Sequence, residues 1–225
     1  MPTALVARRG LLRLAVIAPV AGLAACMGGV GSYSVEEGVR RLLTLSSQRA
    51  FGRLIRPGGF YDDQLTRLAV PDLAGDRSGA VLAAILRTNA VRTRIAVAIN
   101  DLAVDAADRA TPILLDAIRR MSFADALAVL RGGPTAATDL LARETEGAVL
   151  RAMFPEFSTG LRGDAFEILS AALGASTGFD YNAMADMLAR QAGQAIFRAI
   201  GREEADIRRN PRATGDPVLI ALLGG

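Results

Sequence analysis

Apolar residues recur at intervals of three and four along most of the chain after residue 34, which is the spacing of one face of an α-helix. The longest stripe covers 91–121 and passes through Pro112, so that either the helix kinks there or a second helix begins with Thr111 as its cap. Its predicted buried side consists of Ile95, Ile99, Leu102, Ala106, Ala110, Ile113, Ala117 and Met121. No strand pattern rises above this helical spacing, and the sequence therefore predicts an all-α fold.

Capping residues and helix breakers divide the rest of the chain into further helices. Helices are expected over 35–55, 79–88, 123–130, 134–154, near 164–173 and over 181–209, followed by a last short turn from Pro217. Ser34 and Asp180 are the predicted N-caps of their helices, and Ser122 and Asp125 both suit a cap for the helix over 123–130. Pro155 is predicted to end the helix that Pro134 opens. Because alanine is abundant, we expect these helices to pack closely in a single compact domain over 34–225.

The first 25 residues have a different pattern. Arg8, Arg9 and Arg13 precede twelve residues without a charge, and this order is typical of a secretory signal. The apolar run is shorter than the roughly 20 residues that a membrane-spanning helix needs. The alternative is a buried N-terminal helix in which Cys26 is a structural core thiol.

Leu23-Ala24-Ala25-Cys26 closes the apolar run and resembles a bacterial lipobox. The resemblance implies cleavage between Ala25 and Cys26 and attachment of lipid to the Cys26 sulfur, which leaves 26–33 as a short lipidated tether. In enterobacterial lipoproteins, an aspartate directly after the lipidated cysteine resembles a signal for retention in the inner membrane. This chain has Met27 at that position. We therefore expect an outer membrane lipoprotein that faces the periplasm.

Loss of the signal would change the charge of the protein. All 26 basic residues are arginines, and three of them lie in residues 1–25. The remaining chain would therefore have 23 arginines and 23 acidic residues. A formally neutral chain lacks the cationic excess that binds phosphate backbones, and nucleic acid is not an expected partner.

Missing residue types exclude several kinds of catalysis. The chain has no histidine and no lysine, which excludes a Ser-His-Asp triad, a Walker phosphate loop and a Schiff base. A lipidated Cys26 would also leave no thiolate for catalysis or zinc. We expect no cofactor and no resident metal, and any catalysis would rest on carboxylates, hydroxyls, arginine or a bound metal.

Several stretches, in order, resemble one bacterial family. They are Gly59-Phe60-Tyr61, Asn100 with Pro112-Ile113, Asp116 to Ala126, Gly132 to Thr138, and Glu203 to Pro211. This pattern is similar to the DUF4197 family, a domain of unknown function whose members often carry lipoprotein signals. The 155–179 segment looks shorter than is usual there, and the 212–217 tail replaces a more typical Ala-Arg-Thr-Thr run. Asn100, Asp116 and Asn210 are candidate binding residues within these stretches.

A helix start after two glycines is the strongest candidate for a binding site. Gly132 and Gly133 would let a ligand approach the first amides of the helix, where the Thr135 and Thr138 hydroxyls could assist in binding an anion. The alternative is a tight interhelical turn in which threonine caps the helix.

Two charged clusters have alternative interpretations. Asp101, Asp105 and Asp108 share a helix face, where they could hold Ca²⁺ or Mg²⁺, but we favour a solvated face relieved by Arg109 and arginines of a neighbouring helix. Glu204 and Arg208 have favourable i, i+4 spacing. We expect an exposed, salt-bridged helix end there, with a partly buried network lining a cleft as the functional alternative.

These observations favour a non-catalytic helical module that binds a protein partner or a small apolar or anionic ligand. One alternative is a carboxylate-dependent hydrolase of envelope polymers, for which Asp101, Asp105, Asp116 and Glu204 are the candidates. Another is a self-associating structural module, which would expose an apolar patch larger than a few hundred Å².

Overall fold

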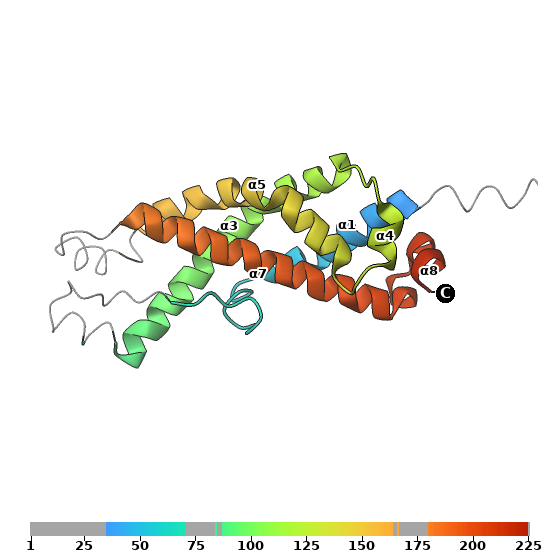
Figure 1. Cartoon of the computed structure of the whole chain (residues 1–225). Helices are drawn as coiled ribbons and strands as arrows, with labels where there is room; N and C mark the ends of the chain where they lie inside the picture. The colour runs from blue at the N-terminus through green and yellow to red at the C-terminus, as the bar shows by residue number, and fades with distance from the viewer. Residues whose placement is uncertain (1–34, 71–83, 85–86, 164–165, 167–179, 225) are drawn as a thin grey trace, which may run out of the picture. The chain divides into compact units, whose positions relative to one another are not determined.

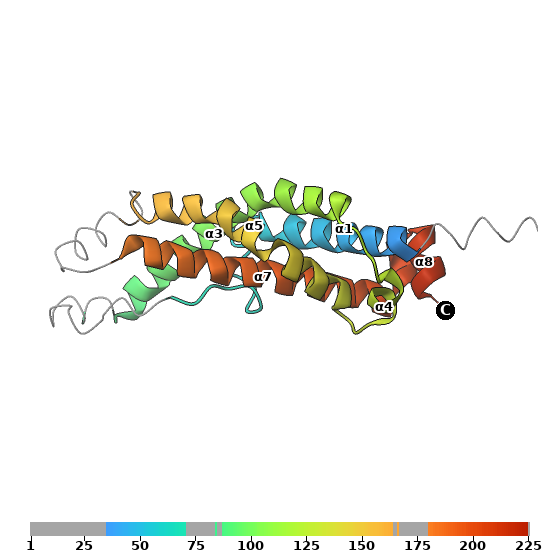
Figure 2. The same ribbon diagram turned by 45° about the horizontal axis from the view of Figure 1, so that its top comes forward.

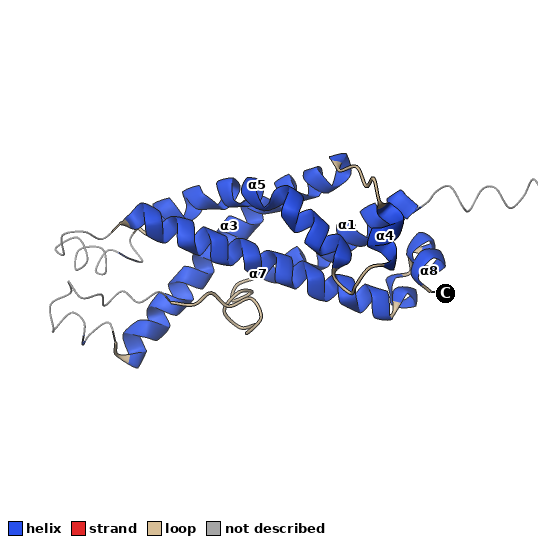
Figure 3. Ribbon diagram, in the orientation of Figure 1, coloured by secondary structure: helices blue, strands red, loops and turns tan. Residues whose placement is uncertain are grey.

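Small side chains let the long helices of this chain pack against one another. The computed structural model describes residues 35–70, 84, 87–163, 166 and 180–224 (Figure 1). Within these ranges all regular structure is helical and no strand occurs (Figure 3), as the apolar spacing predicts. The predicted helices over 79–88 and 164–173 lie almost entirely outside the described residues, and Ser34, Ala25 and Cys26 lie wholly outside them.

Four long helices build the bundle. They are α1 (Val35–Leu54), α3 (Asn89–Arg120), α5 (Ala136–Gly160) and α7 (Tyr181–Arg209). Helices α5 and α7 run antiparallel and lie side by side in both views (Figures 1 and 2). Tyr33–Gly225 clusters as one compact unit. Within the described residues, no helix is both long enough and apolar enough to cross a bilayer.

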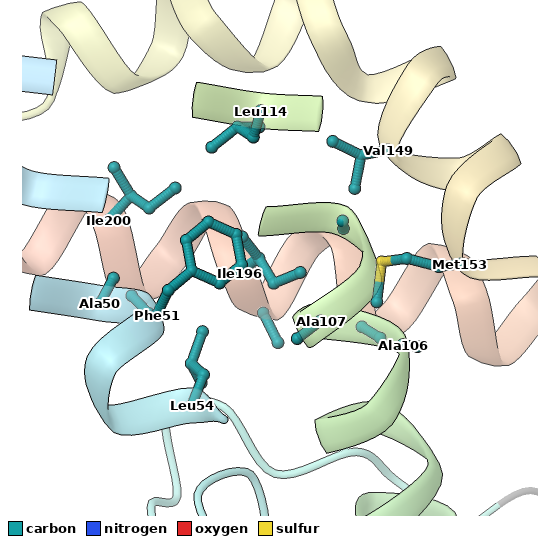
Figure 4. Packing of buried hydrophobic residues seen from close by; sticks show 14 of the residues in the cluster. Ala50, Phe51, Leu54, Ala106, Ala107, Leu114, Val149, Met153, Ile196 and Ile200 are labelled. Atoms are coloured by element: carbon teal, nitrogen blue, oxygen red, sulfur yellow. The ribbon is translucent and has the colours of Figure 1, made fainter. Parts of the chain in front are cut away.

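The core combines large apolar side chains with many alanines. Figure 4 shows Phe51 of α1, Leu114 of α3, Val149 of α5 and Ile196 of α7 around the centre of the bundle. Alanines fill the closest contacts and are fully buried, or exposed by at most 1%, at Ala103, Ala106, Ala107, Ala110, Ala185, Ala189, Ala192, Ala195 and Ala199. Such small residues allow two helix backbones to approach closely while still excluding water.

Helix α3 continues through Pro112 as one element, and Thr111 is not a cap. The Thr111 hydroxyl instead donates to the Ala107 carbonyl at 2.8 Å, one turn earlier. Beyond the proline the buried stripe follows Leu114 and Ile118, which are fully buried, whereas Ile113 is 41% exposed. The prediction for Ile113 was therefore wrong, because continuing the stripe from Ala110 requires a step of four residues rather than three.

The prediction that Pro155 ends its helix was also wrong. Helix α5 passes through Pro155 and ends at Gly160. Proline removes one helical hydrogen bond and crowds the preceding turn. That cost is offset because the continued helix buries Phe157 completely, after Met153, in the core. Tertiary packing therefore overrides the local helix breaker.

Short elements close one end of the bundle. They are α4 (Ala126–Arg131), the 3₁₀ helix η2 (Pro211–Thr214) and α8 (Pro217–Leu223). The predicted N-cap Asp180 is confirmed, since its side chain accepts hydrogen bonds from the Asn182 and Ala183 amides. Of Ser122 and Asp125, Asp125 is the N-cap, and α4 therefore begins at Ala126 rather than at 123. Asp216 caps α8 in the same way. Leu219 docks α8 on the core, as its apolar sequence predicts.

Residues 55–70 form an irregular segment, here called the strap, that crosses from α1 towards α3. Gly58 has a φ of +75°, and a Cβ at Gly59 would lie 2.3 Å from the Leu54 carbonyl oxygen, so both positions require glycine. The Leu68 amide donates to Asn100 Oδ1 at 2.9 Å, and Asn100 Nδ2 donates to the Ala96 carbonyl at 2.7 Å. Asn100 is thus a buried residue that fixes the strap to α3.

Two neighbouring positions in α3 provide a matched test of this packing. Leu114→Ala should lower the free energy of unfolding by about 2–5 kcal/mol, because it leaves a cavity in the core. Ile113→Ala removes a similar side chain from a 41% exposed position and should cost less than about 1 kcal/mol. Urea denaturation followed by circular dichroism measures both values, and equal losses would contradict the assigned face of α3.

Candidate functional site

The start of α5 is held by a carboxylate from α7. The amides of Ala137 and Thr138 donate to the two oxygens of Glu204 at 3.0 and 2.7 Å. The Thr138 hydroxyl also donates to Glu204, at 2.6 Å. These contacts are the ones that the sequence suggested for an external anion, since helix N-termini attract negative charge. An external anion would therefore have to displace Glu204.

Arg208 completes this arrangement on the side of α4. Its guanidinium pairs with Glu204 at 2.8 Å and donates to the carbonyls of Leu130 and Val129 at 2.6 and 3.0 Å. These carbonyls belong to the last turn of α4, where helical partners run out. One ion pair thus joins the end of α4 and the start of α5 to α7.

This network is buried, which corrects the expectation of an exposed helix end. The Glu204 side chain is fully buried and that of Arg208 is 11% exposed. The neighbouring Glu203 is also buried and pairs with Arg53 of α1. Burial lowers the pKa of the Arg53 guanidinium, and the nearby positive charge of Arg202 lowers it further. On the same helix, Asp206 and Arg209 form an exposed pair.

The two glycines before α5 have different surroundings. A Cβ at Gly132 would lie 2.6 Å from the Ala136 Cβ and 3.1 Å from the Ala128 carbonyl oxygen, so the tight turn between α4 and α5 requires glycine there. A Cβ at Gly133 would meet no atom within 4 Å. Thr135 occupies the N-cap position without a capping bond, and its hydroxyl donates to Asp139 at 3.2 Å.

A groove of about 620 Å³ lies between α5 and α7, directly beside this network. Thr138 belongs to both, because its side chain contacts Glu204 and also lines the groove. Leu65 of the strap contributes to the rim. The groove is lined by Leu65, Pro134, Thr135, Thr138, Asp139, Ala142, Glu146, Gln194, Phe197, Arg198, Gly201, Arg202 and Ala205.

The floor of the groove is mainly apolar, and its two walls differ in charge. Phe197, Ala142 and Ala205 are half-buried there. Helix α5 contributes carboxylates, from Asp139 and Glu146, and α7 contributes the guanidiniums of Arg198 and Arg202. The groove can therefore accept an apolar body that carries polar groups of either sign.

Glycine brings the two helices together at one end of the groove. A Cβ on Gly201 would lie 3.1 Å from Thr135 Cγ2 and 3.6 Å from its Cβ. A larger residue at Gly201 would force α5 away from α7 or close this end of the groove. Apolar spacing in the sequence indicates which side of α5 and which side of α7 is buried. It does not indicate that these two sides pack against each other.

Arginines on α7 position the strap beside the groove. Arg198 Nε donates to the Leu65 carbonyl at 3.0 Å, and Arg202 pairs with Asp63 at 2.6 Å. Partial burial by itself would raise the pKa of Asp63, but hydrogen bonds from the Leu65 amide and Arg202 outweigh it and hold the pKa below its usual value. An ionised carboxylate is therefore one of the groups that bind the strap to α7, beside the Leu65 carbonyl.

The remaining predicted residues lie away from the groove. Asn100 holds the strap, as described above, and Asp116 pairs with Arg119 and Arg120 at the end of α3. Asn210 is the exposed residue that separates α7 from η2. None of these three lines the groove. Of the candidates at the start of α5, Thr138 is the one that bonds to Glu204.

The acidic row on α3 is a solvated face, as favoured from the sequence. Asp101, Asp105 and Asp108 are all exposed. Arg109 does not relieve the row as expected, because it pairs with Glu156 of α5 at 2.7 Å. In the described part of the chain, no three carboxylates lie close enough together to hold a metal ion.

The Glu204 network provides a test of buried charge. Glu204→Ala should lower the free energy of unfolding by about 3–5 kcal/mol, because it leaves Arg208 without its counterion and two amides without an acceptor. Asp206→Ala breaks an exposed pair on the same helix and should cost less than about 1 kcal/mol. Urea titrations of both variants measure the difference. A Glu204→Ala loss as small as that of the control would show that the network does not hold these helices together.

Comparison with known proteins gives a family but no activity. No curated protein and no solved structure matches the chain. A family model described as a protein of unknown function, DUF4197, matches residues 29–224, which cover most of the sequence. The resemblance suggested by the motifs is thereby confirmed, and the chain belongs to the DUF4197 family.

Proposed function

We propose that this protein is an outer membrane lipoprotein whose helical domain faces the periplasm and binds an amphipathic ligand in the groove between α5 and α7. Lipidation at Cys26, after cleavage behind Ala25, would anchor it. The support for the anchor is the order of features at the N-terminus, where three arginines precede a short apolar run and the Leu23 to Cys26 motif.

The observation that carries the binding role is the composition of the groove. An apolar floor with charged residues along its two walls suits recognition of an apolar surface with polar groups at its edges. Its volume of about 620 Å³ lies within the range of small-ligand sites. Glu204 and Arg208 do not line the groove. Glu204 instead holds Thr138, which does line it.

Binding is favoured over hydrolysis by the positions of the carboxylates. Asp101, Asp105 and Asp116 lie outside the groove, and Glu204 is buried with its oxygens already bonded. The two carboxylates that do line it, Asp139 and Glu146, are two helical turns apart, about 10 Å along the axis. Because Asp139 accepts from Thr135, one turn earlier, it is drawn away from Glu146. Acid–base hydrolysis of a glycosidic bond needs two carboxyl groups that converge on one bond, and the positions of Asp139 and Glu146 do not favour this.

The anchor has a direct test. Metabolic labelling with a palmitate analogue should mark the wild-type protein and leave Cys26→Ala unmarked, because Cys26 is the only cysteine in the chain. Membrane fractionation of the two proteins in parallel should place only the labelled one with the outer membrane. Equal labelling of both variants would contradict lipidation at Cys26.

The groove is tested with a photo-crosslinking amino acid in intact cells. Placed at Glu146, an exposed residue of the groove wall, the probe should give an adduct of discrete mass. Placed at Arg151, which is exposed on the same helix but does not line the groove, it should give none. If no adduct forms at Glu146, or if the same adducts form at both positions, the groove is not the binding site.

A further inference from the structure

Helix α8 is short, uncharged and only partly covered. All of its residues, Pro217–Leu223, are apolar. Leu219 is fully buried, whereas Val218, Ile220, Leu222 and Leu223 are half-buried and Ala221 is exposed. The helix therefore packs on the bundle through one side and leaves apolar surface on the other.

The same helix lies beside the point at which the described chain begins. A Cβ on Gly38, in the first turns of α1, would lie 2.3 Å from Leu222 Cδ1, so the two helices touch through this glycine. Arg41 of α1 pairs with Asp216, the N-cap of α8, at 3.0 Å. Figures 1 and 2 both place α8 next to the start of α1. The described chain therefore begins beside α8.

The length of that segment limits how far α8 can lie from a lipid attached at Cys26. Val35 follows Cys26 by nine positions, and nine residues span at most about 30 Å even when fully extended. A short connection of this kind gives an effective concentration in the millimolar range. A weak apolar contact that would be negligible for a free protein then becomes populated.

We propose that α8 is a membrane-contacting element that inserts its uncovered apolar side into the interface of the bilayer holding the lipid anchor. This proposal rests on the lipidation of Cys26 proposed above. Apolar side chains gain free energy when they leave water for the acyl boundary. Exposed Arg212, in η2 just before α8, can meet lipid phosphates as α8 inserts. The opposite ends of α3 and α7, near Asn89 and Tyr181, would then point away from the membrane.

The full lipidated chain provides a unique labelling site for the test. Because the thiol of Cys26 would be used in the thioether, an introduced cysteine is the only free thiol. Ala221→Cys places the label on the exposed side of α8, and Asp108→Cys places it at an exposed position of α3 as the matched control. Each protein is labelled with acrylodan and reconstituted into vesicles of phosphatidylcholine and phosphatidylglycerol, with or without brominated acyl chains.

The label at position 221 should shift to shorter wavelength, and brominated chains should quench it several-fold more than the label at 108. No quenching at 221, or equal quenching at both positions, would overturn the role of α8. Ile220→Glu in the Ala221→Cys protein should abolish the quenching while the protein still floats with the vesicles. Retained quenching in that variant would also overturn it.

Flotation of the vesicles separates the two proposals. A protein that floats and incorporates the palmitate analogue, but shows no quenching at 221, is anchored without contact by α8. A protein that neither floats nor incorporates the analogue would overturn lipidation and, with it, the membrane contact of α8.

Discussion

The buried ion pair of Glu204 and Arg208 is the contact on which the arrangement of α4, α5 and α7 depends. Helix ends carry amides and carbonyls without helical partners, and burying them would be costly. Glu204 accepts from the amides at the start of α5, while Arg208 donates to the carbonyls at the end of α4. Because the two side chains also neutralise each other, both helix ends can be buried against α7 without leaving an isolated charge.

This contact also explains the position of the groove. With the start of α5 fixed to the last turns of α7, Thr138 and Gly201 come together at one end, and the facing sides of the two helices form the walls. The strap then completes the rim, held by Asn100 on α3 and by Arg198 and Arg202 on α7. Candidate binding residues such as Glu204, Arg208 and Asn100 thus hold the helices and the strap in place. The surface left for a ligand is largely apolar.

The proposed functions use two different parts of the same bundle. The groove is formed by the middle and end of α7 with the first half of α5, whereas α8 lies beside the first turns of α1. A domain held at the membrane through α8 and a short tether would present its groove at a limited distance from the bilayer. Such an arrangement suits the capture of an amphipathic ligand, because ligands of that kind concentrate at membrane interfaces.

The sequence by itself determined the helical class, most helix boundaries and the N-cap at Asp180, because apolar spacing and capping are local properties. It also indicated the family through its motifs. Tertiary structure decided the rest. Helix α5 continues past Pro155 because the bundle buries Phe157, and the amides after Gly132 bind Glu204 because α7, more than sixty residues later, passes beside them. Burial of Glu204, and the pairing of two helix faces into a groove, are long-range consequences of packing that no local pattern records.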